Sequence, residues 1–480
     1  MSKKYITTTL PYVNADPHIG YAWEVVRADV WARHQRLQGG EVFFNLGTDE
    51  HGSKIYQRAQ ELGLEPQAYC DQQAVRWQEL SRTMNLSEHN FIRTTDEHHV
   101  KAAQEFWRQT DKNGYIYKKK YKTKYCVGCE LEKTDSELVD GKCPLHLNRE
   151  IEIVEEDNYF FKFSDFQQKL LDLYESRPDF VVPAKRFNEI KKFVQMGLQD
   201  FSVSRLKEKM PWGVPVPGDE EQVMYVWFEA LVNYISAIGY PGDMKKFNDW
   251  WPAVQVAGKD NLRQQSAMWQ AMLMAVNLPP SGQIFINSFI TSGGQKMSKS
   301  LGNVISPGEM TAKFGTDGAR YLLASWPSFG EDIDITWENM TDKYNADLAN
   351  GLGNLVSRVF KLASDYSSTE LRQQAEASGE VLDLARTIKD SMEGLRLSEA
   401  LEKIKAKIDW ANKYIDDKKL WDLVKTDKAQ SAKVLGELLG VIVAVGEGLQ
   451  SFMPETAKEI LDRARMDKIQ KGEGLFLRIK

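Results

Sequence analysis

Two separate parts of the chain show the same order of apolar runs, with a helix-like run between two strand-like runs. The runs lie at Lys3–Leu10, Ala22–Gln38 and Glu41–Leu46 in the first part, and at Pro252–Ala257, Gln265–Val276 and Gln283–Phe289 in the second. Strands that alternate with helices are typical of a parallel α/β sheet. We therefore predict one parallel sheet whose strands come from both parts of the chain.

The rest of the chain shows two other patterns of residue types. Residues 115–213 hold three of the four cysteines and charged runs such as Glu150–Asp157, as in an inserted domain. From about Asn345 onward the pattern becomes helical. Apolar residues recur there every three or four positions, which places them on one helix face, at Leu401, Ile404, Ile408, Ala411 and Ile415, and again at Val434, Leu435, Leu438, Leu439 and Ile442. This part is predicted to be an all-α helix bundle.

These changes of sequence pattern divide the 480 residues into several domains, as the usual size of about 150 residues per domain also suggests. The predicted ranges are 1–114 for the first half of the sheet domain, 115–213 for the insertion, 214–325 for its second half, 326–344 for a linker and 345–480 for the helical domain.

Composition and charge exclude several classes of protein. The chain has 62 Lys and Arg against 68 Asp and Glu, a net charge of -6, so any polyanion is expected to be bound locally and DNA is not an expected partner. The start MSKKYITTTLPY has no apolar core of a secretory signal, which predicts a cytoplasmic protein. The apolar stretch Leu438–Gly446 is far shorter than the roughly 20 residues of a membrane span. No membrane partner is expected.

Two short motifs suggest phosphate chemistry. Pro17-His18-Ile19-Gly20-Tyr21 lies where the first strand is followed by the first helix. There Gly20 allows close backbone approach, free N–H groups of the helix start face an anion, and His18 donates a hydrogen bond to a phosphate. The second motif, Lys296-Met297-Ser298-Lys299-Ser300, follows a Gly-Gly pair. Two lysines three apart on a loop are suited to the charge of a polyphosphate.

A third motif predicts a metal site. Cys126 and Cys129 are separated by two residues, and after thirteen more residues Cys143 and His146 are also separated by two. Three thiolates and one imidazole form a closed tetrahedral set for one structural zinc ion, with no position left for a catalytic water. A redox-active disulfide is the weaker alternative in a cytoplasmic chain.

The first two motifs, in this order and at this distance, resemble the HIGH and KMSKS signatures of the class I aminoacyl-tRNA synthetases. The resemblance is greatest to the methionyl-tRNA synthetase family and covers essentially the whole chain. Segments that carry it include TLPYVNADPHIG at 9–20, GTDEHGSK at 47–54, GLQDFSVSR at 197–205, WGVPVPG at 212–218, MYVWFEALVNYISA at 224–237 and the stretch 346–358. It implies a Rossmann-type α/β catalytic domain split by a zinc-binding connective insertion, a linker that contacts the tRNA stem, and a helical anticodon-binding domain.

The resemblance also implies activity and site residues. The protein would use ATP and Mg2+ to form methionyl-adenylate and then transfer the methionyl group to the terminal ribose of tRNA(Met). The implied ATP-binding residues are His18, Gly20, Tyr21, Asp260, Lys296, Met297, Ser298 and Lys299, and the implied methionine-binding residues are Leu10, Tyr12, Asp49, Trp227, Tyr234 and Gln265. Arg205 and Asp49 are expected to hold the activated amino acid. Trp227 and Tyr234, seven apart, are expected on one face of one helix.

Anticodon recognition is assigned to two residues of the helical domain. Asn354 and Arg358 match family residues that read the anticodon, and they are four apart, so one helix face carries both. The third reader of the family is a tryptophan, which the closing stretch Asp467–Lys480 does not contain. Because no further module follows the helical domain in this sequence, a monomer is expected.

Departures from the family pattern leave alternatives open. Tyr21 stands in place of the last His of HIGH, Gln265 at the position of a pocket histidine, and Gln270 where proline is common. A class I synthetase with another amino-acid specificity, or a synthetase-like protein that binds RNA without catalysis, are the competing interpretations. The short insertion disfavours the leucine, isoleucine and valine enzymes, and a simple nucleotidyltransferase would lack the zinc insertion and the helical tail.

Overall fold

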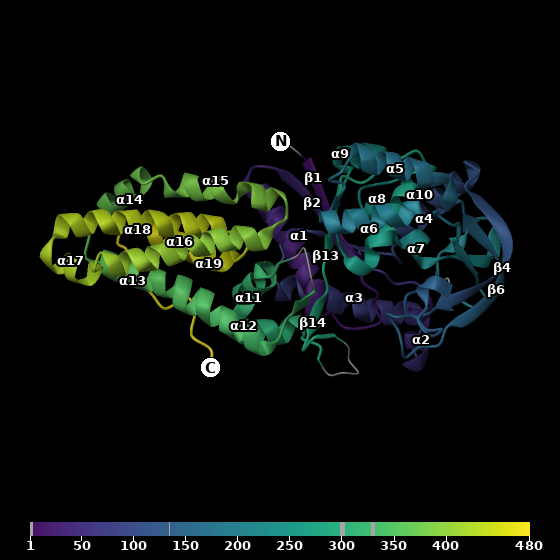
Figure 1. The fold of residues 1–480 in the computed structure, drawn as a ribbon, viewed down its shortest axis with the longest axis horizontal. Helices are drawn as coiled ribbons and strands as arrows, with labels where there is room; N and C mark the ends of the chain where they lie inside the picture. The colour runs from purple at the N-terminus through teal and green to yellow at the C-terminus, as the bar shows by residue number, and fades with distance from the viewer. Residues whose placement is uncertain (1–2, 134, 298–302, 328–331) are drawn as a thin grey trace. The chain divides into compact units, whose positions relative to one another are not determined.

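The computed structural model describes residues 3–133, 135–297, 303–327 and 332–480 (Figure 1). The chain divides into two compact units. The first comprises Met1–Pro17, Glu41–Glu79 and Glu88–Asn287, and the second comprises His18–Gly40, Leu80–Ser87 and Ser288–Lys480. Among the residues that the structure describes, every helix is too short or too polar to cross a membrane.

The first unit is built on a six-stranded sheet in which every strand pair is parallel. The inner strands are buried on both faces along most of their length, as β-branched and aromatic runs favour in a parallel sheet. In order across the sheet they are β3 (Asn90–Arg93), β2 (Glu41–Thr48), β1 (Lys3–Thr8), β12 (Val254–Gly258), β13 (Gln283–Asn287) and β7 (Val181–Val182). Because β1–β3 and β12–β13 come from the two predicted parts of the chain, the split parallel sheet is confirmed.

The segment between these parts contributes β7 to the parallel sheet, and its other strands form a separate antiparallel sheet in the order β5-β4-β6-β8. Its long strands β4 (Ile116–Cys126) and β6 (Glu152–Phe161) pair so that Lys120 lies opposite Asp157 and Lys122 opposite Glu155. The Lys122–Glu155 ion pair measures 3.2 Å. The charged runs in the sequence therefore lie on two complementary strands of one antiparallel pair. The short strands are β5 (Leu131–Lys133) and β8 (Phe201–Ser202), and the helices α5 (Gln167–Ser176) and α6 (Ala184–Gln195) connect β6 to β8.

The remaining elements of the first unit surround the sheet and its aromatic core. Trp269 is fully buried and stacks on Phe106 with ring centres 5.9 Å apart. A small antiparallel sheet has the strand order β10-β11-β9. These elements are α2 (Ser53–Glu61), α4 (Glu97–Lys112), β9 (Ser204–Leu206), β10 (Pro215–Val216), β11 (Asp219–Met224), α7 (Val226–Ala230), α8 (Asn233–Ser236), α9 (Met244–Trp250) and α10 (Trp269–Ala275), while α3 (Pro66–Thr83) runs from the first unit into the second.

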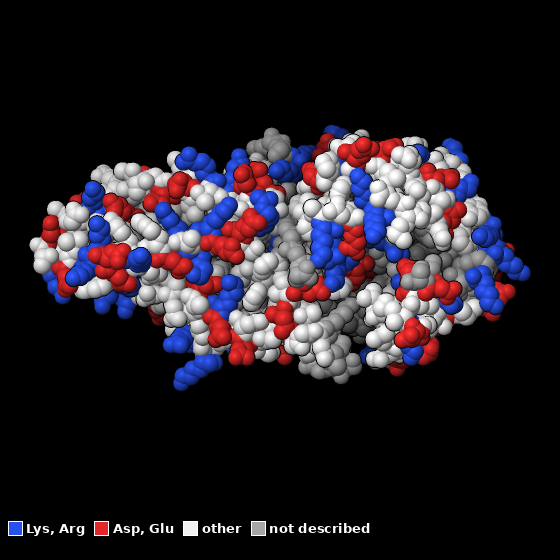
Figure 2. All heavy atoms as spheres, in the orientation of Figure 1, with Lys and Arg blue, Asp and Glu red and all other residues white. Residues whose placement is uncertain are grey.

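The second unit consists mainly of helices (Figure 1). The predicted apolar face of α16, from Leu401 to Ile415, is buried, and so is the predicted face of α18. On the face shown in Figure 2, Lys and Arg are interspersed with Asp and Glu over this bundle. The helices are α1 (Ile19–Leu37), α11 (Pro307–Ser325), α12 (Trp337–Lys343), α13 (Asn354–Ala363), α14 (Ser368–Ala377), α15 (Glu380–Glu393), α16 (Leu397–Asp417), α17 (Leu420–Thr426), α18 (Lys428–Leu449) and α19 (Pro454–Arg465), with β14 (Ile290–Ser292), β15 (Gln295–Lys296) and β16 (Ile333–Asp334) in a small sheet.

A buried arginine joins several segments of the second unit. Arg320 of α11 forms an ion pair with Asp29 of α1 at 2.8 Å and donates hydrogen bonds to the carbonyl oxygens of Met84 and Phe452. A fully buried guanidinium requires such partners for all of its donors. Arg320 therefore attaches α1, and the residues at its start, to the helix bundle.

Candidate active site and metal centre

The start of α1 is organised by His18, which is the N-cap residue. Its Nδ1 accepts a hydrogen bond from the backbone N–H of Gly20 at 3.0 Å, so the ring proton is on Nε2. A Cβ at position 20 would lie 2.7 Å from the His18 ring, which only glycine avoids. The expectation of free N–H groups is wrong for the first two helical residues, because Ile19 donates to the carbonyl of Ile305 and Gly20 to His18. An anion would meet the imidazole Nε2–H rather than these amides.

The second motif approaches the same helix start. In the β14–β15 hairpin, Thr291 pairs with Lys296, and a Gly293-Gly294 turn joins the strands. The Met297 methyl carbon lies 3.7 Å from where a Cβ on Gly20 would be. The two predicted motifs therefore meet within the second unit. Ser298 and Lys299 lie outside the described residues.

Asp49 is a buried carboxylate directly after β2. Its backbone N–H donates to the carbonyl of Pro11 at 3.0 Å, which places it beside Tyr12. The side chain is nearly inaccessible, and its Oδ1 has no hydrogen-bond partner among the described residues. Burial and the neighbouring Glu229 and Glu130 carboxylates raise the pKa of Asp49 well above its ordinary value. A cationic ligand would relieve this cost.

Aromatic side chains border the same region. The Tyr12 and Trp227 rings pack edge to face with centres 6.3 Å apart, and neither the Tyr12 hydroxyl nor the Trp227 Nε1 has a partner in the described part of the chain. Leu10 is half-buried at the end of the same segment. Apolar side chains that carry a few polar atoms without hydrogen-bond partners are typical of a ligand pocket.

The single helix predicted to carry Trp227 and Tyr234 is wrong. Trp227 lies on α7 and Tyr234 on α8, with a turn between them. The side-chain amide of Asn233 donates to the carbonyl of Ala230 at 2.6 Å. This bond competes with the regular helical bond to that carbonyl, which explains the interruption.

Gln265 belongs to a buried ring of amide and hydroxyl groups. Its Nε2 donates to the Tyr234 hydroxyl at 2.7 Å, and its Oε1 accepts from Gln255 at 3.2 Å. Ser281 donates to Gln255 at 2.6 Å, and Gln270 bonds both to Ser281 and to the backbone carbonyl of Gln265. The predicted helix over 265–276 is π-helical at Gln264–Met268 before α10 begins.

Arg205 and Asp260 occupy different environments. Arg205 of β9 is buried, and its guanidinium carbon lies 5.1 Å from the ring centre of Tyr125 and 4.7 Å from that of Tyr225. Asp260 is exposed in a 3-10 turn that follows β12. The carboxyl ends of parallel strands are the usual ligand side of such a sheet.

The four predicted metal ligands converge. Their ligand atoms all lie within 4.8 Å of one another. Cys129 Sγ is 3.5 Å from Cys143 Sγ, and His146 Nδ1 is 3.8 Å from Cys126 Sγ and 3.9 Å from Cys143 Sγ. Tetrahedral zinc with these ligands requires spacings of about 3.6 to 3.8 Å. The residues therefore fit a closed structural zinc site.

The two predicted anticodon residues share one face of α13. Asn354 donates to Asn412 at 3.2 Å, and Arg358 pairs with Asp416, both on α16. The Arg358 guanidinium also lies over the ring of Trp421, 5.8 Å from its centre, and Trp421 is 42% exposed. An exposed tryptophan beside an arginine is a surface on which an unpaired base can stack.

Comparisons with known proteins show the same family. A family model described as "tRNA synthetases class I (M)" matches residues 4–152 and 145–360. The methionine–tRNA ligase of Thermotoga maritima is 40% identical over 98% of this chain and 77% of its own, and that of Brucella suis is 41% identical over 96% and 91%. The chain belongs to the class I tRNA synthetases.

Solved structures of this synthetase family agree with the fold. Mycobacterium tuberculosis methionyl-tRNA synthetase in complex with methionyl-adenylate has a TM-score of 0.88 at 35% identity, over 96% of this chain and 94% of the other. A second structure of that enzyme bound to methionyl-adenylate has a TM-score of 0.90 at 32% identity, over 99% and 100%. An adenylate of this kind implies the use of ATP by that enzyme.

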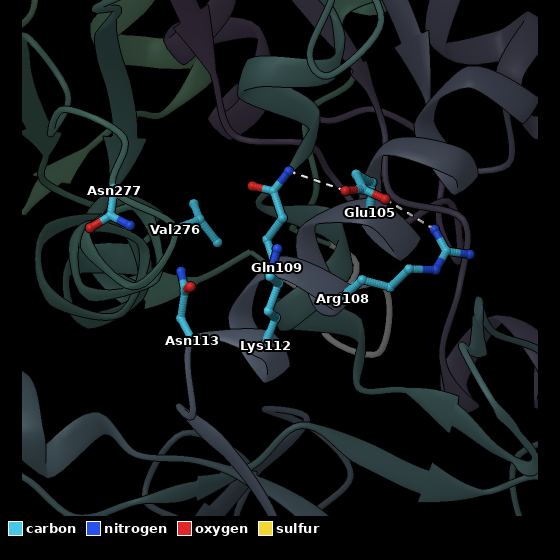
Figure 3. Close-up of a pocket in the computed structure, with 7 residues that line it drawn as sticks. All are labelled: Glu105, Arg108, Gln109, Lys112, Asn113, Val276 and Asn277. Atoms are coloured by element: carbon cyan, nitrogen blue, oxygen red, sulfur yellow. Dashed lines mark hydrogen bonds and ion pairs between the residues drawn. The ribbon is translucent and has the colours of Figure 1, made fainter.

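Two features of the structure have no counterpart in the sequence motifs. Trp421 belongs to none of these motifs, and its place beside an expected anticodon residue follows from its distance of 5.8 Å to Arg358. The second feature is a surface pocket of about 330 Å3 whose lining does not include the predicted site residues. Figure 3 shows the lining residues, among which Glu105 accepts hydrogen bonds from Gln109 and Arg108. The lining residues are Glu105, Arg108, Gln109, Lys112, Asn113, Val276 and Asn277.

Proposed function

We propose that the protein is a methionine–tRNA ligase, which activates methionine with ATP and transfers it to the 3'-terminal ribose of tRNA(Met). The observation that carries this proposal is the buried Asp49 carboxylate, whose Oδ1 has no hydrogen-bond partner among the described residues, beside the unpartnered polar atoms of Tyr12 and Trp227. The carboxylate is suited to the methionine ammonium group. The apolar ring surfaces are suited to its thioether.

In the activation step, a methionine carboxylate oxygen attacks the α-phosphorus of ATP. The bond from that phosphorus to the bridging oxygen breaks, and pyrophosphate leaves with Mg2+. His18 donates its Nε2–H to a phosphate oxygen, next to Gly20 and Tyr21. Lys296, Met297, Ser298 and Lys299 form the loop that meets the charge of the leaving group, and Asp260 lies on the nucleotide side. Positioning and charge stabilisation account for most of such a rate enhancement.

Methionine is held by residues of the first unit. Asp49 binds the ammonium group, and Arg205 lies near the reacting carboxylate and phosphate. Leu10, Tyr12, Trp227 and Tyr234 surround the side chain, and Gln265 fixes the Tyr234 hydroxyl. Gln265 and Tyr234 offer neutral hydrogen-bond donors to the thioether, whose sulfur is a weak acceptor.

In the transfer step, the ribose hydroxyl of tRNA displaces AMP from the adenylate. Asn354, Arg358 and Trp421 read the anticodon, by stacking and by hydrogen bonds to unpaired bases. One zinc ion bound by Cys126, Cys129, Cys143 and His146 supplies structural rigidity to the insertion when present. The domains comprise residues 1–114, 115–213, 214–325, 326–344 and 345–480, and the protein acts as a monomer.

ATP–pyrophosphate exchange tests the proposal against its alternatives. Purified, zinc-replete protein is supplied with methionine, leucine, isoleucine, valine or cysteine, one at a time. The proposal predicts exchange with methionine alone. Exchange with another amino acid would change the specificity, and a folded protein without exchange would support an RNA-binding role without catalysis.

A further inference from the structure

Glu130, the residue after the zinc ligand Cys129, is almost completely buried. Its carboxylate accepts hydrogen bonds from the Ser53 hydroxyl at 3.1 Å and from the backbone N–H of Lys54 at 3.3 Å. These are the first residues of α2, whose N-cap, Gly52, has no side chain that could satisfy the helix start. Glu130 therefore caps α2 from a distant part of the chain.

Gly52 makes room for this cap and connects it to Asp49. The φ of Gly52 is +103°, and a Cβ there would lie 3.3 Å from both carboxylate oxygens of Glu130. Between Asp49 and Gly52, the Trp212 Nε1 donates to the carbonyl of Glu50 at 2.6 Å. The segment that carries Asp49 is thus fixed by Trp212 along its length and by Glu130 at its end.

The methionine pocket is linked to the same cap. Lys54, whose backbone N–H bonds to Glu130, places its ammonium group 4.7 Å from the ring centre of Tyr12. Tyr12 in turn pairs with Asp49 through a backbone bridge. A shift of Glu130 would therefore reach both the ring and the carboxylate that are assigned to methionine.

Glu130 also fixes the rings around Arg205. The Tyr125 hydroxyl donates to its carboxylate at 3.3 Å, and the Tyr225 hydroxyl donates to its backbone carbonyl. These are the two rings that lie within about 5 Å of the Arg205 guanidinium. One residue next to a metal ligand therefore contacts the supports of both Asp49 and Arg205.

We infer that Glu130 is a positioning residue that couples the zinc knuckle, residues 126–146, to Asp49 and Arg205, so that metal binding sets the affinity for methionine. This inference rests on the proposed function, which assigns methionine to those two residues. Its physical basis is that a complete ligand set fixes the backbone at Cys129. Glu130 is the next residue along the chain, so its position is fixed as well. Its left-handed φ of +53° is a strained backbone conformation that the surrounding structure must maintain.

The test compares the zinc-loaded variants Glu130→Ala and Glu130→Gln with wild type. Glu130→Ala should raise the KM for methionine about tenfold, as for other residues that orient ligands indirectly. The zinc content of one ion per chain should not change. Glu130→Gln should stay within about twofold of wild type, because its amide oxygen accepts the same bonds. Glu150→Ala is the matched control, an exposed glutamate near the knuckle that pairs with Lys142.

Removal of zinc with a chelator gives a second readout, the Kd for methionine from tryptophan fluorescence. Zinc removal should weaken methionine binding in wild type but have little further effect in Glu130→Ala. An equal loss in both proteins, or an unchanged KM in zinc-loaded Glu130→Ala, would overturn the coupling. If Glu130→Ala does not fold, the zinc content of Glu130→Gln is measured instead. A content below one ion per chain would then overturn the coupling. A wild type without methionine-dependent exchange would instead refute the proposed function.

Discussion

At the scale of single residues, His18 has two separable roles. It caps α1 through Nδ1, and we assign its Nε2–H to a phosphate oxygen. His18→Ala should lower pyrophosphate exchange about 10²- to 10³-fold, as the loss of one oriented donor does elsewhere, and should cost about 1 kcal/mol of stability through the lost cap. His18→Asn keeps a capping oxygen, so it should recover the stability and not the exchange. Near-normal exchange in His18→Ala would contradict the assignment.

The raised pKa of Asp49 predicts that methionine binding depends on pH. Burial and nearby carboxylates raise the pKa of Asp49 well above its ordinary value, so the free protein becomes protonated at Asp49 at a higher pH than an ordinary aspartate does. Only the ionised form attracts the ammonium group, so the KM for methionine should fall as pH rises through this raised pKa and then level off. Asp49→Asn should raise the KM and abolish its slope. A wild-type KM that is flat from acid to neutral pH would count against this role.

At the scale of elements, the buried hydrogen-bond ring of Gln255, Gln265, Gln270 and Ser281 supports α10 and the turn at Ser281. Gln270→Ala would leave the Ser281 N–H and the Gln265 carbonyl buried without these partners. The free energy of unfolding should fall by about 1 to 3 kcal/mol in urea titration. Gln195→Ala, on the exposed face of α6, is the control and should change little. Equal stability of the two variants would show that the ring contributes nothing.

The apolar runs predicted the strands and helices that they cover to within a few residues, because burial sets their period. What they could not show depends on contacts across the chain. The break between α7 and α8 arises from one side-chain bond of Asn233, and α1 begins before its apolar run because His18 caps it. Among site residues, motif spacing located the metal ligands, whereas Trp421 and Glu130 are recognisable only from their spatial neighbours.

At the scale of the whole molecule, the two half-reactions should separate by mutation. Trp421→Ala should lower kcat/KM for tRNA aminoacylation by about 10- to 100-fold, the usual effect of losing one stacked base. Pyrophosphate exchange should not change, because activation does not require tRNA. Trp410→Ala is the matched control, since Trp410 is also exposed but stacks on Tyr414 instead of Arg358. Unchanged aminoacylation by Trp421→Ala would remove it from the anticodon site.

Methionine binding by Asp49 and the Tyr12–Trp227 pair is the basis of the proposed function. A crystal structure of the protein with methionine and a non-hydrolysable adenylate analogue tests it most directly. We expect the ammonium group within hydrogen-bond distance of Asp49 and the thioether against the rings of Tyr12 and Trp227. An amino acid bound elsewhere, with Asp49 Oδ1 still without a hydrogen-bond partner, would contradict this assignment.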